Sequence, residues 1–212
     1  ILNNAHFGRN MKGVKQGDIK KLLIIESLPK PINFTGGMDP LTYGGSFTME
    51  RVMGTVPVEE DGSANMELPA NRSFFFVALD KDNNSVKRMQ SFLSVMPGEV
   101  SSCIGCHEER VNTPIQGLNK GQLMALKRPP SKIELIKDIP QVFDFPRDIQ
   151  PVLDKNCVSC HSYNKREGGV ILTGDRGPIF SHSYVTLTLK KQFIDGRNQA
   201  KSNYAPRTIG AS

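Results

Sequence analysis

Tryptophan is absent from this sequence of 212 residues, and all aromatic residues together make up only 7% of it. A core of large aromatic side chains is therefore excluded, although 38% hydrophobic and 23% charged residues are ordinary for a folded protein. The sequence also has no run of 18 or more apolar residues, so it predicts no membrane span. A net charge of +6 comes without a basic run interleaved with aromatics, and no nucleic-acid partner is predicted.

Cysteine and histidine are equally scarce, with four residues of each. Two copies of the pattern Cys-x-x-Cys-His, at residues 103–107 and 157–161, use every cysteine. Two disulfide bonds would leave unexplained the histidine that directly follows each second cysteine. A zinc site formed by four cysteines, or by two cysteines and two histidines, is another alternative, but Cys106 and Cys157 are far apart in sequence for one compact zinc knuckle. A thioredoxin-like pair would need a βαβ context, which the sequence lacks.

Cys-x-x-Cys-His is the attachment pattern of haem c. Its two cysteines form thioether bonds to vinyl groups on one side of the ring, and the adjacent histidine supplies an axial nitrogen to the iron. The sequence therefore predicts two covalently bound haem c groups. The expected attachment residues and proximal ligands are Cys103, Cys106 and His107 for the first haem, and Cys157, Cys160 and His161 for the second.

The second axial ligand of each iron decides between electron transfer and substrate binding. His182 is a possible distal ligand of the second haem, and His6 is a possible distal ligand of the first, although either histidine also fits an ordinary structural role. Methionine and tyrosine side chains are further candidates for the first iron, with core packing as their alternative role. These candidates are Met53, Met89, Met96 and Tyr43, and the side chains that could pair haem propionates are Arg51, Lys87, Arg88 and Arg110.

The fold expected from the pattern of apolar segments is α+β. Residues 20–26 and 74–79 are short apolar runs that predict buried strands, and the turn at 80–84 leads to a returning strand at 86–95. Asp61-Gly62 predicts a hairpin between residues 47–58 and 63–68. Residues 80–84 resemble a calcium loop only faintly, and a hairpin turn is the preferred interpretation. Together these strands predict a small antiparallel β-sandwich-like domain that carries the first haem.

The second half of the chain predicts a mostly helical, loop-rich domain that carries the second haem. Residues 147–156 are expected to form a helix that leads into the second motif, and residues 116–128 allow a short helix. The remainder, residues 162–212, is polar and rich in turns. The expected organisation is a β-rich domain at 1–128, a proline-containing connector at 129–145 and a cytochrome c-like domain at 146–212.

Several of these segments resemble the hydrazine synthase alpha subunit and its relatives. GTVPVEEDGSA at 54–64, LPA at 68–70, FFVALD at 75–80, PGE at 97–99 and SCIGCHE at 102–108 resemble the middle domain of that family. DIQPVLDKNCVSCH at 148–161 resembles its C-terminal cytochrome c domain. The resemblance implies a longer exported protein, with a β-propeller before residue 1 and the rest of a truncated cytochrome domain after residue 212.

The resemblance also implies specific iron ligands. In the family the middle-domain iron is held by a tyrosine four residues after the motif histidine, and that histidine binds zinc, but Val111 stands at the corresponding position here. This difference favours His107 as an ordinary proximal ligand and argues against hydrazine synthesis. The second haem of the family has two histidine ligands, which implies a distal histidine after His161.

Three functions follow as alternatives. The favoured one is electron transfer by a dihaem module within a larger periplasmic redox protein, with a redox protein or a small molecule as donor or acceptor. The second is a multihaem oxidoreductase of small nitrogen or oxygen compounds, in which the first haem is catalytic. The third is a structural or docking module braced by its haems. No catalytic residue is identified, because no acid or base constellation accompanies the motifs.

Overall fold

The computed structural model describes residues 1–8, 11, 13–29, 49–89, 91–106, 121–177 and 179–189. These residues form two compact units. The first unit contains Ile1–Leu28 and Glu50–Ile139, and the second contains the described residues from Pro140 onward. Strands make up the regular structure of the first unit and helices that of the second, so the expected α+β class is confirmed at this level.

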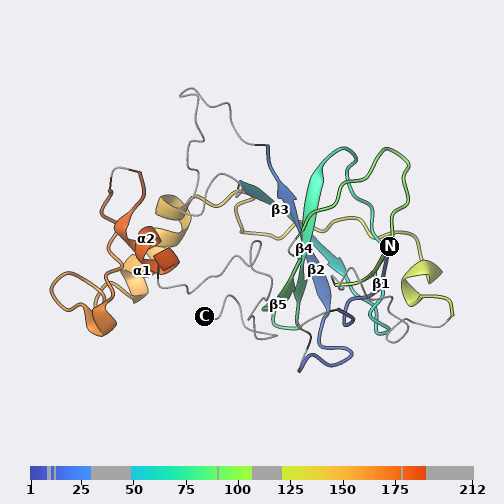
Figure 1. Ribbon diagram of the computed structural model, residues 1–212, viewed down its shortest axis with the longest axis horizontal. Helices are drawn as coiled ribbons and strands as arrows, with labels where there is room; N and C mark the ends of the chain where they lie inside the picture. The colour runs from blue at the N-terminus through green and yellow to red at the C-terminus, as the bar shows by residue number, and fades with distance from the viewer. Residues whose placement is uncertain are drawn as a thin grey trace. The chain divides into compact units, whose positions relative to one another are not determined.

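A four-stranded antiparallel sheet forms the centre of the first unit (Figure 1). Its strands, in spatial order, are β3 (Glu50–Pro57), β2 (Lys21–Ser27), β4 (Ser73–Leu79) and β5 (Ser85–Arg88). The long β2–β4 pairing aligns Ile24 with Phe76. The strands predicted at 20–26 and 74–79 are thus confirmed as the two central strands of the sheet.

Apolar residues are buried on both faces of this sheet, because successive side chains of a strand point to opposite faces. Phe74 and Ala78 of β4 belong to the larger core cluster, together with Leu22, Ile24 and Val56 from the neighbouring strands. The intervening residues of β4 form a second cluster, which consists of Phe75, Val77 and Leu79. Burial on both sides explains why β4 is a continuous apolar run rather than an alternating one.

The hairpin expected after residues 47–58 is wrong in its second half. A tight turn does form, since Gly62 N donates to Glu59 O and Glu59 N donates to Ser63 O. The following residues, however, do not return along β3. Ala64 instead pairs with Leu2, and Met66 bridges to Ser131. The pairing partners lie far away in sequence, so the local turn signal could not reveal them.

A second, two-stranded sheet joins β1 (Leu2–Asn4) to β6 (Cys103–Gly105) in parallel. The described residues thus contain one antiparallel sheet and one short parallel ribbon, and the expected sandwich of two antiparallel sheets is corrected accordingly. The ribbon matters for function because β6 begins at the first cysteine of the first motif.

The chain segment after the first motif is anchored on the turn at 59–65. Asp61 accepts a hydrogen bond from Met124 N at 2.9 Å, and Ser63 Oγ accepts one from Ala125 N at 3.0 Å. Of the helix expected at 116–128, the described part is a single 3-10 turn, η1 (Met124–Lys127). Residue 134 then pairs with Thr55, which requires glycine at position 54, because a Cβ there would lie 2.2 Å from Glu134 O.

The second unit contains the helix predicted at 147–156 and a helix that was not expected. A π-helical turn, η2 (Phe145–Ile149), runs directly into α1 (Gln150–Asn156), with Pro151 in the first turn where its missing N–H costs nothing. After a short 3-10 turn, η3 (Glu167–Gly169), the chain forms α2 (His182–Leu189). In the part of the chain that the structure describes, no helix has the length and hydrophobicity needed to cross a bilayer.

Candidate functional site

The first cysteine pair is held by the N-terminal segment. Cys103 N donates to Ile1 O at 2.8 Å, and Cys106 N donates to Phe7 O at 2.7 Å. Gly8 permits this close approach, since a Cβ at that position would lie 2.3 Å from Cys106 O. The backbone on both sides of the cysteine pair is therefore fixed by residues from the other end of the unit.

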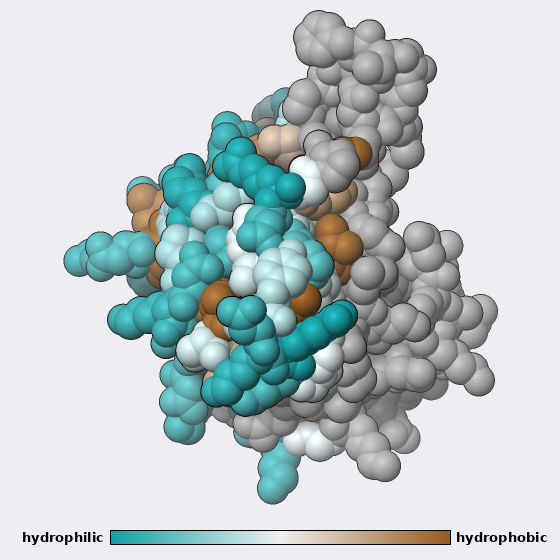
Figure 2. Space-filling view, turned by 90° about the vertical axis from the view of Figure 1, so that its left-hand side faces the viewer, coloured by the Kyte–Doolittle hydropathy of each residue, from teal (hydrophilic) through white to brown (hydrophobic). Residues whose placement is uncertain are grey.

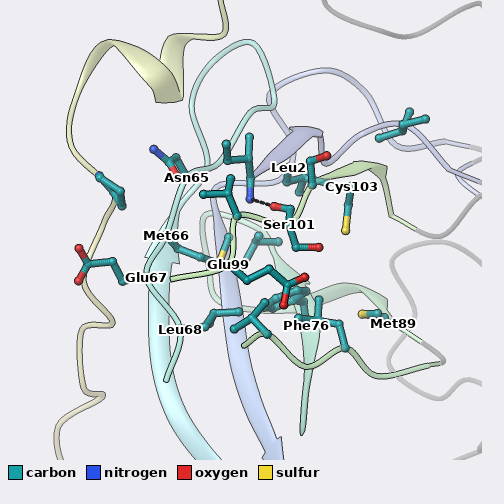
Figure 3. A pocket seen from close by; sticks show the side chains of 18 of the residues that line it. Leu2, Asn65, Met66, Glu67, Leu68, Phe76, Met89, Glu99, Ser101 and Cys103 are labelled. Atoms are coloured by element: carbon teal, nitrogen blue, oxygen red, sulfur yellow. Dashed lines mark hydrogen bonds between the residues drawn. The ribbon is translucent and has the colours of Figure 1, made fainter. Parts of the chain in front are cut away.

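Cys103 and Cys106 line a cavity of about 730 Å³ (Figure 3). Its floor includes Leu22 and Phe76 of the sheet, and Met66, Leu68, Leu93 and Val95 lie among its walls. Figure 3 shows that the cavity is assembled from segments far apart in sequence, and the backbone nitrogen of Ile1 donates to Ser101 O at 2.9 Å. The volume lies within the range of about 300–1,000 Å³ that is typical of cofactor sites.

The chemistry of this cavity fits a haem attached through the two cysteines. The lining is mainly apolar, and the nearby Met96, Val100 and Ile104 expose apolar surface that a flat hydrophobic ring would cover. The charged side chains among the lining residues are the carboxylates of Glu67 and Glu99. Anionic propionates would be repelled from these groups, so the site favours a ring whose apolar part is buried and whose propionates face water.

The propionate partners proposed from the sequence do not line this cavity. Arg51 lies 3.4 Å from the buried carboxylate of Glu26, and Arg88 lies 3.0 Å from Glu50. The Arg88 guanidinium also stacks over the Phe75 ring at 4.7 Å. Lys87 is not among the lining residues either. Arg110, His107, Val111 and Tyr43 lie outside the described residues.

Two of the three candidate methionine ligands line the cavity. Met89 and Met96 are lining residues, whereas Met53 packs against the larger core cluster. Met66, which the sequence did not single out, also lines the cavity. The sequence did not reveal its place in the cavity lining, because Met66 follows the Asp61-Gly62 turn in a segment that was interpreted as the second strand of a hairpin.

His6 has a structural role in the folded chain. Its Nε2 accepts hydrogen bonds from Gly17 N at 3.0 Å and Ile19 N at 3.1 Å. Burial lowers the pKa of His6, and the positive charge of Lys20 lowers it further, whereas Asp18 opposes this change. Because Nε2 accepts from the backbone, the ring proton of His6 lies on Nδ1, and His6 is not among the residues that line the cavity.

The second cysteine pair follows the C-terminal end of α1. Cys157 N donates to Leu153 O at 2.8 Å, and His161 N donates to Cys157 O at 2.9 Å, so the motif continues the helix as a tight turn. Glu167 N then donates to Cys160 O at 3.1 Å and closes the loop that follows. The helix end thus places both cysteines and the histidine on one short, hydrogen-bonded turn.

The ring of His161 is oriented by a backbone carbonyl. Its Nδ1 lies 3.0 Å from Glu167 O, a contact in which the ring N–H donates to the carbonyl oxygen. This bond fixes the proton on Nδ1 and leaves the Nε2 lone pair for a metal, which is the usual arrangement of ligating histidines. Leu172 N also donates to His161 O at 2.8 Å, which holds the main chain of the residue.

His182 lies at the start of α2 and lines a shallow hollow of about 510 Å³. Its ring contacts Tyr163 edge-on, with the ring centroids 5.9 Å apart. The hydroxyl of Tyr163 donates to Asp175, which raises the pKa of Tyr163 and lowers that of the Asp175 carboxyl. Cys157, Cys160 and His161 do not line this hollow. The structure therefore gives His182 polar and aromatic neighbours, and His182 as distal ligand of the second haem stays a prediction.

The face of the second unit drawn in Figure 2 is largely hydrophilic, with hydrophobic residues scattered over it. The described residues contain no group of three cysteine, histidine or acidic side chains arranged to hold a metal ion. Residues 80–84 form a turn closed by Asp80, as preferred from the sequence, since Asp80 accepts hydrogen bonds from Asp82 N and Asn84 N.

Comparison with known proteins shows what the chain is similar to. Residues 17–108 match the family described as the hydrazine synthase alpha subunit middle domain. No curated protein sequence matches the chain. Among solved structures, hydrazine synthase from Kuenenia stuttgartiensis is similar, with a TM-score of 0.66 and 18% sequence identity over 99% of this chain. The match covers 34% of that protein, so the chain spans about a third of its length. The resemblance predicted from the sequence is thereby confirmed.

Proposed function

Because the chain is hydrazine synthase alpha-like, we propose that it is a dihaem c-type module that transfers electrons within a larger periplasmic redox protein. The observation that carries the proposal is the apolar cavity beside Cys103 and Cys106, which matches the attachment chemistry of the first motif. Haem, when bound, supplies a one-electron couple at its iron. The periplasmic location follows from the expectation that haem c is attached outside the cytoplasm.

The first unit provides attachment and protection from water. Cys103 and Cys106 supply the two thioether sulfurs, on a backbone held by Ile1 and Phe7. Leu22 and Phe76 contribute apolar surface that a bound ring would contact. A site of low polarity disfavours the more highly charged state of a bound redox group, and burial is one of the means by which a protein raises a haem potential.

The second unit provides a preorganised ligand. His161 holds its Nδ1 proton on Glu167 O, so its Nε2 is ready to bind iron without losing orientational freedom at that moment. Cys157 and Cys160 stand on the same turn and supply the thioether sulfurs. The hydrophilic face of this unit suits contact with water or with a polar redox partner.

An optical experiment distinguishes electron transfer from catalysis. Oxidised and reduced spectra of the purified protein would be recorded with and without nitric oxide or hydroxylamine. We expect two haems that are six-coordinate and low-spin, and spectra that these small ligands do not change. A high-spin ferric signal that shifts with either compound would overturn electron transfer in favour of the catalytic alternative. Absence of a haem spectrum would overturn both functions.

A further inference from the structure

Among the residues that line the cavity of the first unit are methionines, whose sulfur atoms could serve as a second ligand of a haem iron. We infer that the thioether sulfur of Met89 binds the iron of the haem attached at Cys103 and Cys106, an inference that rests on the proposed function. Met89 directly follows β5 and lines the same cavity as the two cysteines. In the view of Figure 3, Met89 and Cys103 lie on the same side of the cavity.

The backbone of Met89 is fixed by the sheet. Met89 N donates to Phe76 O at 2.8 Å, which extends the β4–β5 pairing by one residue. The side chain is half-buried and packs against the cluster of Phe75, Val77 and Leu79. A ligand on a rigid strand end, with its stem held by packing, loses little conformational freedom when its sulfur binds a metal.

The other methionines are placed less well for this role. Met53 packs in the core and does not line the cavity. Met96 is 65% exposed, and its turn is closed by a hydrogen bond from Met96 N to Glu99. Met66 packs against the larger core cluster and belongs to the segment that bridges to Ser131. Met89 combines a place in the cavity wall with a backbone held by the sheet and a stem packed on an apolar cluster.

A thioether ligand also suits the surroundings. Sulfur is a soft, neutral donor that needs no proton exchange and no charged partner, and it is compatible with an apolar wall. Methionine opposite histidine raises the potential of a c-type haem. The first haem is therefore expected to have a high potential and to accept electrons readily.

The test compares Met89→Leu with Met53→Leu as the matched control, because Met53 does not line the cavity. Leucine keeps the apolar volume and removes only the sulfur. Each variant would be made in a Cys157→Ala/Cys160→Ala background, so that the spectrum reports the first haem alone. The readouts are the near-infrared sulfur-to-iron charge-transfer band, the ferric spin state and the midpoint potential. Met89→His serves as a rescue variant that supplies a nitrogen ligand.

We expect the charge-transfer band in the parent protein and in the Met53→Leu control, and its loss in Met89→Leu together with a high-spin ferric signal. Met89→His should restore the low-spin state without the band and with a lower potential. A band that persists in Met89→Leu, or its absence from a parent that carries the haem, would overturn Met89 as ligand while the dihaem proposal stands. A parent without covalent haem at Cys103 and Cys106 would instead overturn the proposed function itself.

Discussion

The two units place the same five-residue pattern on different kinds of backbone. In the first unit the cysteines lie on and after a strand, beside a cavity built over a sheet with two apolar clusters. In the second unit they follow a seven-residue helix, and much of the burial is polar, with Gln150, Ser181 and Ser183 as buried residues. The first unit has an apolar core of its own, whereas the described buried residues of the second unit are the apolar Ile171 and Leu172 and these few hydrogen-bonded polar residues.

The largest expected effect is a loss of structure in the second unit, but not in the first, when haem attachment is prevented. Replacing Cys157 and Cys160 by alanine should remove hydrogen-exchange protection from α1 and α2, because the few buried apolar groups of the second unit cannot offset the entropy of ordering it. Replacing Cys103 and Cys106 by alanine should leave β2 and β4 protected. Equal protection of α1 and α2 in the parent and in the variant without the second haem would show that this unit folds without it.

The next effect tests the apolar core of the first unit. Phe74 is fully buried at 0% exposure, so Phe74→Ala should lower the free energy of unfolding of this unit by about 3–5 kcal/mol. Phe92 is 68% exposed, and Phe92→Ala should change that free energy by less than about 0.5 kcal/mol. Urea titration followed by circular dichroism measures both values. Similar effects from the two variants would argue against a core centred on β4.

A smaller effect tests the polar contacts of the second unit. The hydroxyl of Ser183, which is 0% exposed, donates to Gln150 Oε1, and Gln150 Nε2 donates to Leu172 O at 3.0 Å. Ser183→Ala leaves a buried amide oxygen without this donor and should cost about 1–3 kcal/mol. The exposed Ser159 provides the control as Ser159→Ala. A haem-loaded Ser183→Ala protein that melts at the parent temperature would refute this role.

The smallest effect concerns acid stability of the first unit. Burial raises the pKa of Asp61, but hydrogen bonds from Met124 N and Ser63 outweigh it, so the pKa of the folded state is lowered. The stabilisation from Asp61 is therefore present above the unfolded value of about 3.9 and is lost as the pH falls through the folded pKa. Below about pH 5, Asp61→Asn should make the free energy of unfolding depend less on pH. Asp82→Asn, at an exposed site, should leave that dependence unchanged. If the free energy of unfolding fell with decreasing pH in the same way in the parent and in Asp61→Asn, this role of Asp61 would be contradicted.

Local sequence signals predicted the parts of the fold that depend on local chemistry. The apolar runs at 20–26 and 74–79 became the central strands because their residues are buried on both faces of one sheet. The Asp61-Gly62 turn also formed, and Pro151 did mark the first turn of α1. Pairing across long sequence separations escaped prediction, as the bridges from Ala64 to Leu2 and from Met66 to Ser131 show.

The sequence predicted the cysteines of the candidate site but not the residues that form the cavity beside them. The two motifs name the cysteines, but the cavity draws its lining from the N-terminus, from β2 and β4, and from residues 65–70 and 93–106. The helix α2 was missed because its sequence, HSYVTLTL, is rich in β-branched residues with low helix propensity. Ser181 offered a weak signal for it, since its hydroxyl accepts a hydrogen bond from Tyr184 N in the first turn.

The most direct test of the central claim uses protein produced in cells that attach haem c. The intact mass of the denatured protein and its pyridine haemochrome spectrum would both be measured. Thioether attachment at both motifs predicts a polypeptide heavier by two haem groups. It also predicts that one group is lost in Cys103→Ala/Cys106→Ala and the other in Cys157→Ala/Cys160→Ala. A mass equal to that of the bare polypeptide, with free thiols or bound zinc at the four cysteines, would contradict a haem function for both units.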